Sequence, residues 1–137
     1  MSNVRYVLDT SALLTLIEDE PGAVRVEQVL RSENVLIPWM CSLEVVYITQ
    51  QERGVAEAER RYALLKALPV THLWELEEAL LLMAARLKAS YRLSLADTII
   101  AACAIRERAI LLHKDPQYDA LSGHVQLENL PYKSTKS

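Results

Sequence analysis

The chain has 137 residues, of which 51% are hydrophobic, and its formal charge is −3. This length fits one domain that buries a sizeable core. The acidic balance counts against a pure nucleic-acid-binding module, and the presence of only three glycines argues against a glycine-rich phosphate loop.

Strand and helix patterns alternate along the chain. Short, β-rich apolar runs predict strands at residues 4–8, 35–37, 70–72 and 110–113, with a further edge strand after Val125. Apolar spacing and turn residues predict helices at residues 11–19, 23–31, 40–53, 55–67, 75–88 and 94–108. This order favours a single α/β domain over residues 1–132, with a mainly parallel sheet covered on both faces, and a flexible tail at 133–137.

Several features constrain the environment of this domain. No apolar run approaches the roughly 20 residues of a membrane helix, and no cationic leader opens the chain, so we expect a cytoplasmic protein with no membrane partner. Cys41 and Cys103 each lie inside an apolar run, as core thiols do, and suggest neither a disulfide nor a zinc site. The stretch from Ala79 to Ala85 is so apolar that it must be buried on most sides or meet a partner.

Acidic residues interrupt or end four of the apolar runs. These residues are Asp9, Glu44, Asp97 and Asp115. In open α/β sheets, ligands bind at the carboxyl ends of the strands, where loops lead into helices. Asp9 and Asp115 follow predicted strands, and Asp97 and Glu44 fall in the first turns of predicted helices. We therefore expect all four at one end of the sheet.

Helix capping is the simpler explanation for each acid taken singly. Asp9 can cap the helix that begins near Ser11, Asp97 stands three residues after Ser94 as in a capping box, and Asp115 begins an Asp-Pro turn. Capping does not explain why all of them converge on one edge. Two carboxylates about 5 Å apart repel by roughly 3 kcal/mol at an effective dielectric near 20, whereas a helix N-terminus returns about 0.3–1 kcal/mol. A divalent cation relieves that repulsion, and oxygen ligands without Cys or His favour Mg²⁺ or Mn²⁺.

Four segments around these acids resemble the signatures of the PIN-domain ribonucleases, particularly the small VapC-type toxins of toxin–antitoxin pairs. LDTSAL is similar to the first signature, SLEVVYI to the second, LSLADTIIAACAI to the third and LLHKDPQY to the fourth. The resemblance covers the chain from Val4 to about Leu130. It implies a PIN-like α/β/α sandwich of about five strands, often paired as a homodimer.

The resemblance also implies a site and an activity. Asp9, Glu44, Asp97 and Asp115 would hold Mg²⁺ or Mn²⁺, with Ser11 as the hydroxyl position beside Asp9 and Thr10 in support. The implied reaction is endonucleolytic cleavage of structured RNA, with a cognate antitoxin as partner. His113 stands where the family commonly has Thr or Ser, and Tyr118 replaces the usual Phe; for His113 and for Asp119 a structural role is the simpler interpretation.

Phosphate contacts would have to come from basic residues outside the acid cluster. Arg92 and Lys114 are the better candidates because they lie close to motif acids. The others are Arg53, Arg60, Arg61, Arg86 and Lys88.

Alternative functions remain open at this point. A solitary PIN nuclease in RNA processing carries the same motifs, and a non-catalytic interaction module would use its acids only as helix caps. A phosphoacceptor receiver or a haloacid-dehalogenase-type phosphatase is disfavoured, because Asp9 is followed by Thr10 and Ser11 and not by a second acid.

Overall fold

A computed structural model describes residues 4–132 of the chain. The tail predicted at 133–137 lies outside the described residues. The elements follow in the order β1 (Arg5–Leu8), α1 (Thr10–Ile17), α2 (Ala23–Ser32), β2 (Asn34–Pro38), α3 (Trp39–Arg53), α4 (Val55–Ala67), β3 (Thr71–Leu73), α5 (Glu78–Ser90), α6 (Leu95–Glu107), β4 (Ile110–His113), the 3₁₀ helix η1 (Pro116–Leu121) and β5 (Leu127–Asn129).

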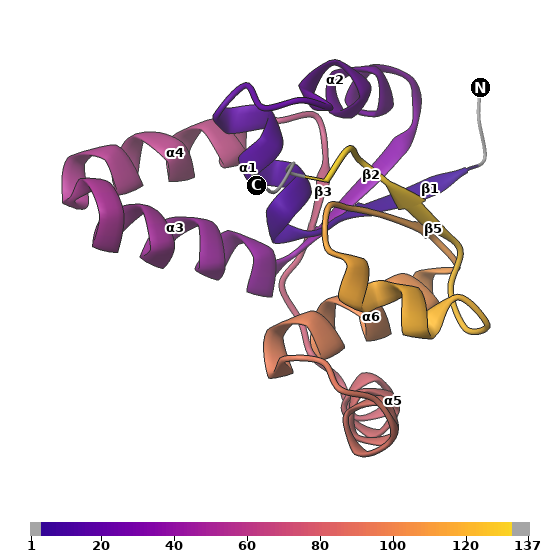
Figure 1. Cartoon of the computed structure of the whole chain (residues 1–137). Coiled ribbons are helices and arrows are strands. Elements are labelled where there is room, and N and C mark those ends of the chain that lie inside the picture. The colour runs from indigo at the N-terminus through magenta and orange to yellow at the C-terminus, as the bar shows by residue number, and fades with distance from the viewer. Residues whose placement is uncertain (1–3, 133–137) are drawn as a thin grey trace, which may run out of the picture.

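The five strands form one sheet in the order β3-β2-β1-β4-β5, and every pair is parallel. The first strand therefore lies at the centre, where Val7 pairs with Leu36 of β2 and Leu111 of β4. Helices cover both faces of the sheet, with α5 and α6 on one side and α1 and α2 on the other (Figure 1). The predicted α/β/α sandwich with a mainly parallel five-stranded sheet is confirmed.

The core consists mainly of Leu, Val, Ile and Ala side chains. In β1, Val7 and Leu8 have no exposed surface, because parallel strands are covered on both faces. Helix α6 is the most deeply buried helix, since every residue from Thr98 to Cys103 is covered by the sheet and its neighbours. Cys41 and Cys103 are buried free thiols. No helix described between residues 4 and 132 is long and apolar enough to cross a membrane.

Three local details differ from the sequence prediction. Strand β3 begins one residue later than expected, at Thr71, and α5 begins at Glu78 and not at Glu75. Trp74 stacks on His72 at 5.4 Å and receives the Lys66 ammonium over its ring, which holds this segment outside the helix. Pro116 opens a short 3₁₀ helix that was not predicted, because its fixed φ suits a first helical position.

Candidate active site

The four predicted acids follow the carboxyl ends of the strands. Asp9 directly follows β1, and Asp115 comes two residues after β4. Glu44 lies in the second turn of α3, the helix that follows β2, and Asp97 lies in the first turn of α6. Because β1 lies between β2 and β4, this topology brings residues far apart in sequence to one edge of the sheet.

Hydrogen bonds fasten the ends of β1 and β4 to one another. The Asp9 N–H donates to the carbonyl of Leu112 at 3.2 Å. The Lys114 N–H donates to Ser11 Oγ at 2.9 Å, across 103 residues of sequence. Ser11 in turn donates its hydroxyl to Asp9 Oδ1 at 2.6 Å. The predicted supporting residue Ser11 therefore ties the segment after β4, which carries Asp115, to Asp9 at the end of β1.

Asp9 is a buried carboxylate with an unusual affinity for protons. Only 2% of the residue is exposed, and Oδ1 also caps α1 by accepting from the Ala12 N–H at 2.8 Å. Burial raises the pKa of Asp9 from 3.8 to about 7, even though the bonds from Ser11 and Ala12 lower it. Repulsion from Asp97 and Asp115 raises this pKa further. A buried carboxyl group whose pKa lies near 7 is typical of functional sites.

Glu44 is oriented by the residue next to Asp9. Thr10 is buried, and its hydroxyl donates to Glu44 Oε1 at 2.6 Å. This bond connects the start of α1 with the second turn of α3. Helix α3 is also joined to β1, because the Cys41 thiol lies 3.4 Å from the carbonyl oxygen of Leu8. The predicted support from Thr10 thus takes the form of a direct bond to the second acid.

The helix that carries Asp97 is capped by another residue, which leaves the Asp97 carboxylate free for a different contact. Ser94 caps α6 by accepting from the Asp97 N–H at 3.1 Å, so the Asp97 side chain is not required as a cap. Its Oδ1 accepts a hydrogen bond from the hydroxyl of Tyr118 at 3.1 Å. Burial raises the pKa of Asp97, the Tyr118 bond lowers it, and repulsion from Asp115 and Glu44 raises it.

Tyr118 is the residue of this site that sequence reasoning treated only as a substitute for Phe. It is fully buried, and burial together with the charges of Asp9 and Asp97 raises its pKa well above the ordinary value. The phenol therefore stays protonated and donates to Asp97. The signal in the sequence was a tyrosine three residues after a motif aspartate.

Asp115 does act as a cap. Its Oδ1 accepts from the Gln117 N–H at 2.9 Å at the start of η1. His113 has no exposed surface, its Nδ1 accepts from the Asp115 N–H at 3.0 Å, and its ring meets Tyr118 edge-on. Burial lowers the pKa of His113, so the ring stays neutral near pH 7. The structural interpretation of His113 agrees with these contacts, since the ring positions the Asp115 backbone inside the protein.

The four carboxylates share one electrostatic neighbourhood without touching one another. Repulsion from the charges of Asp97 and Asp115 acts on Asp9, and repulsion from Asp115 and Glu44 acts on Asp97. Each acid accepts a hydrogen bond from a neutral donor, and within residues 4–132 no three Asp, Glu, His or Cys side chains stand close enough together to ligate one ion. The donor set is oxygen only and carries excess negative charge, which is the chemistry that fits a hard divalent cation.

Most of the basic residues considered for phosphate binding are already engaged. Arg53 and Arg61 pair with Glu18, and Arg60 pairs with Glu57. The Lys114 side chain is 5% exposed and lies 3.5 Å from Glu20. Among the described residues, Arg92 has no ion pair and remains exposed beside the Asp97 helix.

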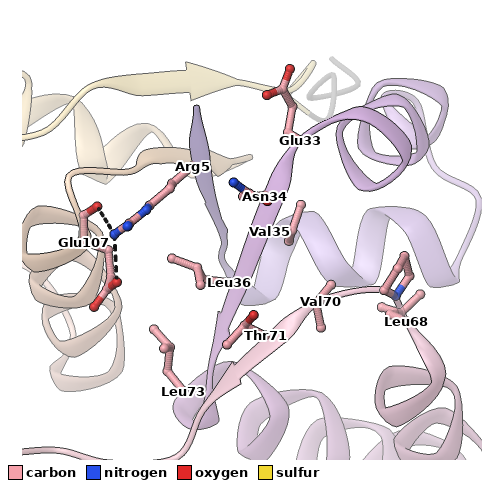
Figure 2. A pocket seen from close by; sticks show the side chains of 11 residues that line it. Arg5, Glu33, Asn34, Val35, Leu36, Leu68, Val70, Thr71, Leu73 and Glu107 are labelled. Atoms are coloured by element: carbon pink, nitrogen blue, oxygen red, sulfur yellow. Dashed lines mark hydrogen bonds and ion pairs between the residues drawn. The ribbon is translucent and has the colours of Figure 1, made fainter. Parts of the chain in front are cut away.

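A cavity of about 580 Å³ lies elsewhere, along the amino ends of β1, β2 and β3. Figure 2 shows Arg5 bonded to Glu107 at one side of this cavity, with Thr71 and Leu36 among the other lining side chains. Parallel strands place their amino ends opposite the edge where the acids gather. This cavity is therefore separate from the candidate active site.

The comparison with protein-family models decides the family. The PIN-domain model matches residues 6–123, which include all four acids. The chain belongs to the PIN-domain family. No curated protein matched the chain.

Solved structures share this PIN fold at low sequence identity. VapBC2 from Rickettsia felis, bound to a DNA fragment from its promoter, aligns with a TM-score of 0.78 and 15% identity over 93% of this chain and 100% of that one. VapBC-1 from nontypeable Haemophilus influenzae gives 0.72 and 21% over 92% and 98%. VapC20 from Mycobacterium tuberculosis, a toxin that cleaves the sarcin-ricin loop, gives 0.70 and 15% over 88% and 97%. At these identities the PIN fold is what is shared.

Proposed function

We propose that this PIN domain is a metal-dependent endoribonuclease that hydrolyses RNA phosphodiester bonds and serves as the toxin of a toxin–antitoxin pair. The observation that supports this proposal is that Asp9, Glu44, Asp97 and Asp115 follow the carboxyl ends of the strands or begin the helices there, where repulsion from Asp97 and Asp115 acts on Asp9 and repulsion from Asp115 and Glu44 acts on Asp97. Helix capping explains the bonds of Asp9 and Asp115. It does not explain the carboxylates of Glu44 and Asp97, which cap no helix.

The oxygen-only donor set fits Mg²⁺ or Mn²⁺ as the cofactor, with Asp9, Asp97 and Asp115 as the residues that would hold it. No three described acids stand close enough together to ligate one ion, so one or two of these carboxylates would bind it directly and water would complete its shell. When bound, such an ion lowers the pKa of water and neutralises charge that develops on the phosphate. Glu44 is assigned to a second ion, to an outer water or to proton transfer.

The surrounding side chains hold these carboxylates in place. Ser11 fixes Asp9, Thr10 fixes Glu44 and Tyr118 fixes Asp97. Each of these donors is a hydroxyl on a helix, so its hydrogen bond restrains the orientation of the carboxylate. Partners that orient ligands in this way typically contribute about 10–100-fold to metal affinity or activity.

The test is cleavage of RNA followed by analysis of the product ends. Attack by water leaves a 5′ phosphate and a 3′ hydroxyl, whereas a 2′,3′-cyclic phosphate would show attack by the ribose hydroxyl and refute this mechanism. Asp97→Asn keeps the shape of the side chain and the Ser94 cap, so cleavage should be lost while the circular dichroism spectrum is retained. An unchanged cleavage rate in this variant would show that the acid cluster takes no part in the reaction.

Exposed apolar side chains support a protein partner. Leu81 and Leu82 on α5 are 52% and 48% exposed, and α3 exposes Leu43 to 48%. The structures with the same fold include VapBC proteins and a toxin–antitoxin complex from Klebsiella pneumoniae. We expect a cognate antitoxin and a homodimer, to be checked by co-purification of the two proteins and by light scattering of the isolated chain. A monomer that binds no neighbouring gene product would favour the solitary nuclease.

The non-catalytic interaction module makes the opposite prediction for cations. Titration with Mn²⁺ should raise the melting temperature of the wild type and not that of the Asp9→Asn, Asp97→Asn double variant. Equal responses of both proteins would favour the module.

A further inference from the structure

A second cavity, of about 680 Å³, opens beside the acid cluster. Its walls come from the loop between α5 and α6 and from the start of η1, and they include Lys88, Ser90, Tyr91, Arg92, Ser94 and Gln117. We call this cavity the basic pocket. Its volume lies within the range of about 300–1,000 Å³ that is usual for ligand sites.

Two residues of the basic pocket are bonded directly to the proposed catalytic acids. Ser94 accepts from the Asp97 N–H, and the Gln117 N–H donates to the Asp115 carboxylate. The basic pocket therefore adjoins the acid cluster, and a polymer bound at the acids can extend into it.

The charge of the basic pocket is opposite to that of the acid cluster. Lys88 and Arg92 contribute two positive charges, and no acidic residue lines the pocket. The cavity in Figure 2, by contrast, contains both Glu33 and Glu107. Because the whole chain carries a charge of −3, a polyanionic substrate depends on such a local positive region.

Arg92 is the side chain in the pocket that is available to a ligand. Lys88 donates to the carbonyl of Leu93 at 2.8 Å and thereby holds the loop. Tyr91 is bonded through its hydroxyl to His124 at 2.7 Å, which braces the loop from the side of β5. Arg92 lies between Tyr91 and Leu93, which these two bonds hold, and it is exposed and has no ion pair among residues 4–132. A guanidinium group presents paired donors that match two phosphate oxygens.

We propose that the basic pocket binds an RNA phosphate next to the scissile bond, with Arg92 as the residue that positions it. This proposal rests on the proposed nuclease function and adds the direction in which the bound RNA strand extends from the acid cluster. Contacts to phosphate position the strand and carry no sequence information. Arg92 therefore sets substrate affinity and not the identity of the cleaved sequence.

The test is binding of a fluorescein-labelled, mixed-sequence single-stranded RNA, measured by anisotropy in Mg²⁺ buffer. The Asp97→Asn protein serves as the parent, so that the probe stays intact. Adding Arg92→Ala should weaken binding roughly five- to tenfold and reduce the slope of log K against log salt by about 0.7. Arg92→Lys should retain that slope, since it keeps the charge.

Arg86→Ala is the matched control. Arg86 is also exposed, has no ion pair among the described residues, and lies on α5 outside the pocket lining. Arg86→Ala removes the same charge as Arg92→Ala. An equal loss of binding in both variants would show that only the total charge of the protein matters, and it would overturn the pocket assignment. In the protein with Asp97 intact, Arg92→Ala should raise KM and leave kcat unchanged.

The two levels of the proposal fail in different ways. If the parent binds RNA and the wild type cleaves it, but Arg92→Ala binds as tightly as the parent, the pocket assignment alone is wrong. If the wild type cleaves no RNA and the parent binds none, the nuclease function is wrong and the pocket assignment falls with it.

Discussion

Replacing Asp9 by Asn should stabilise the metal-free protein at alkaline pH. The substitution removes the buried charge, and Asn caps helices about as well as Asp, so Oδ1 can still accept from Ala12 and Ser11. The pKa of Asp9 rises from 3.8 unfolded to about 7 folded. At about 1.4 kcal/mol per pKa unit, ionising this group inside the fold costs about 4 kcal/mol, a large share of the 5–15 kcal/mol that is typical of a whole domain.

The sign of the pH dependence follows from the raised pKa. Between pH 4 and pH 7 the folded state binds more protons than the unfolded state, so stability falls as the pH rises. The contribution is fully present below pH 3.8 and is lost as the pH passes through 7. From pH 5 to pH 8 the wild type should lose about 2–3 kcal/mol through this one group.

The assay is urea unfolding in EDTA at pH 5 and pH 8. Asp9→Asn should exceed the wild type by several kcal/mol at pH 8, and the gap should narrow markedly at pH 5, where wild-type Asp9 is protonated. Asp9→Ala removes the charge and the cap together, so it should lie about 1 kcal/mol below Asp9→Asn. Asp119→Asn is the control for charge alone, because Asp119 is exposed, and it should change stability by less than about 0.5 kcal/mol. A gap that is absent at pH 8, or the same at both values, would refute the assignment of a strained carboxylate at Asp9.

Three further outcomes follow from the same contacts. Saturating Mg²⁺ at about 100 times its dissociation constant should stabilise the wild type at pH 8 by about 2.7 kcal/mol in urea unfolding, and this gain should vanish in Asp9→Asn. Tyr118→Phe removes the hydroxyl that holds Asp97, so cleavage should fall about tenfold or more at limiting Mg²⁺, whereas a rate unchanged at every concentration would deny the tyrosine an orienting role. The bond from Arg25 lowers the pKa of Glu128 below 4.5. This interaction therefore stabilises the fold above pH 4.5, and its contribution is lost as the pH falls through the lowered pKa. Arg25→Met should reduce this acid-induced loss of stability, as followed by thermal melting from pH 3 to pH 6.

The sequence predicts the sheet and the edge where the acids gather because both depend on local patterns. The buried runs of β1 and β4 are continuous apolar segments, which parallel strands require, and their order along the chain leaves few topologies. Asp9 follows β1 directly and Asp115 comes two residues after β4, so their placement needs only the end of each strand. The positions of Glu44 and Asp97 follow in the same way from the starts of two helices.

The long-range contacts could not be predicted, because they join residues that no local pattern relates. The bond from Tyr118 to Asp97 depends on how η1 packs against α6, and η1 itself was read as a turn. Lys114 looks free in sequence, yet Glu20 lies within 3.5 Å of its ammonium group in the fold. The predicted start of α5 was three residues too early, because Trp74 stacks on His72 and the chain before Glu78 is not helical.

The central position of β1 has a consequence for how the protein is made. A chain leaves the ribosome with its amino end first, so Asp9 emerges long before β4, the neighbour that completes one side of its strand. Until β4 and η1 are synthesised, no carboxylate from Asp115 and no phenol from Tyr118 can reach the edge of the sheet. Under the proposed function, the nuclease would thus remain inactive while it is still being translated, and a product terminated before residue 110 would lack part of the proposed active site.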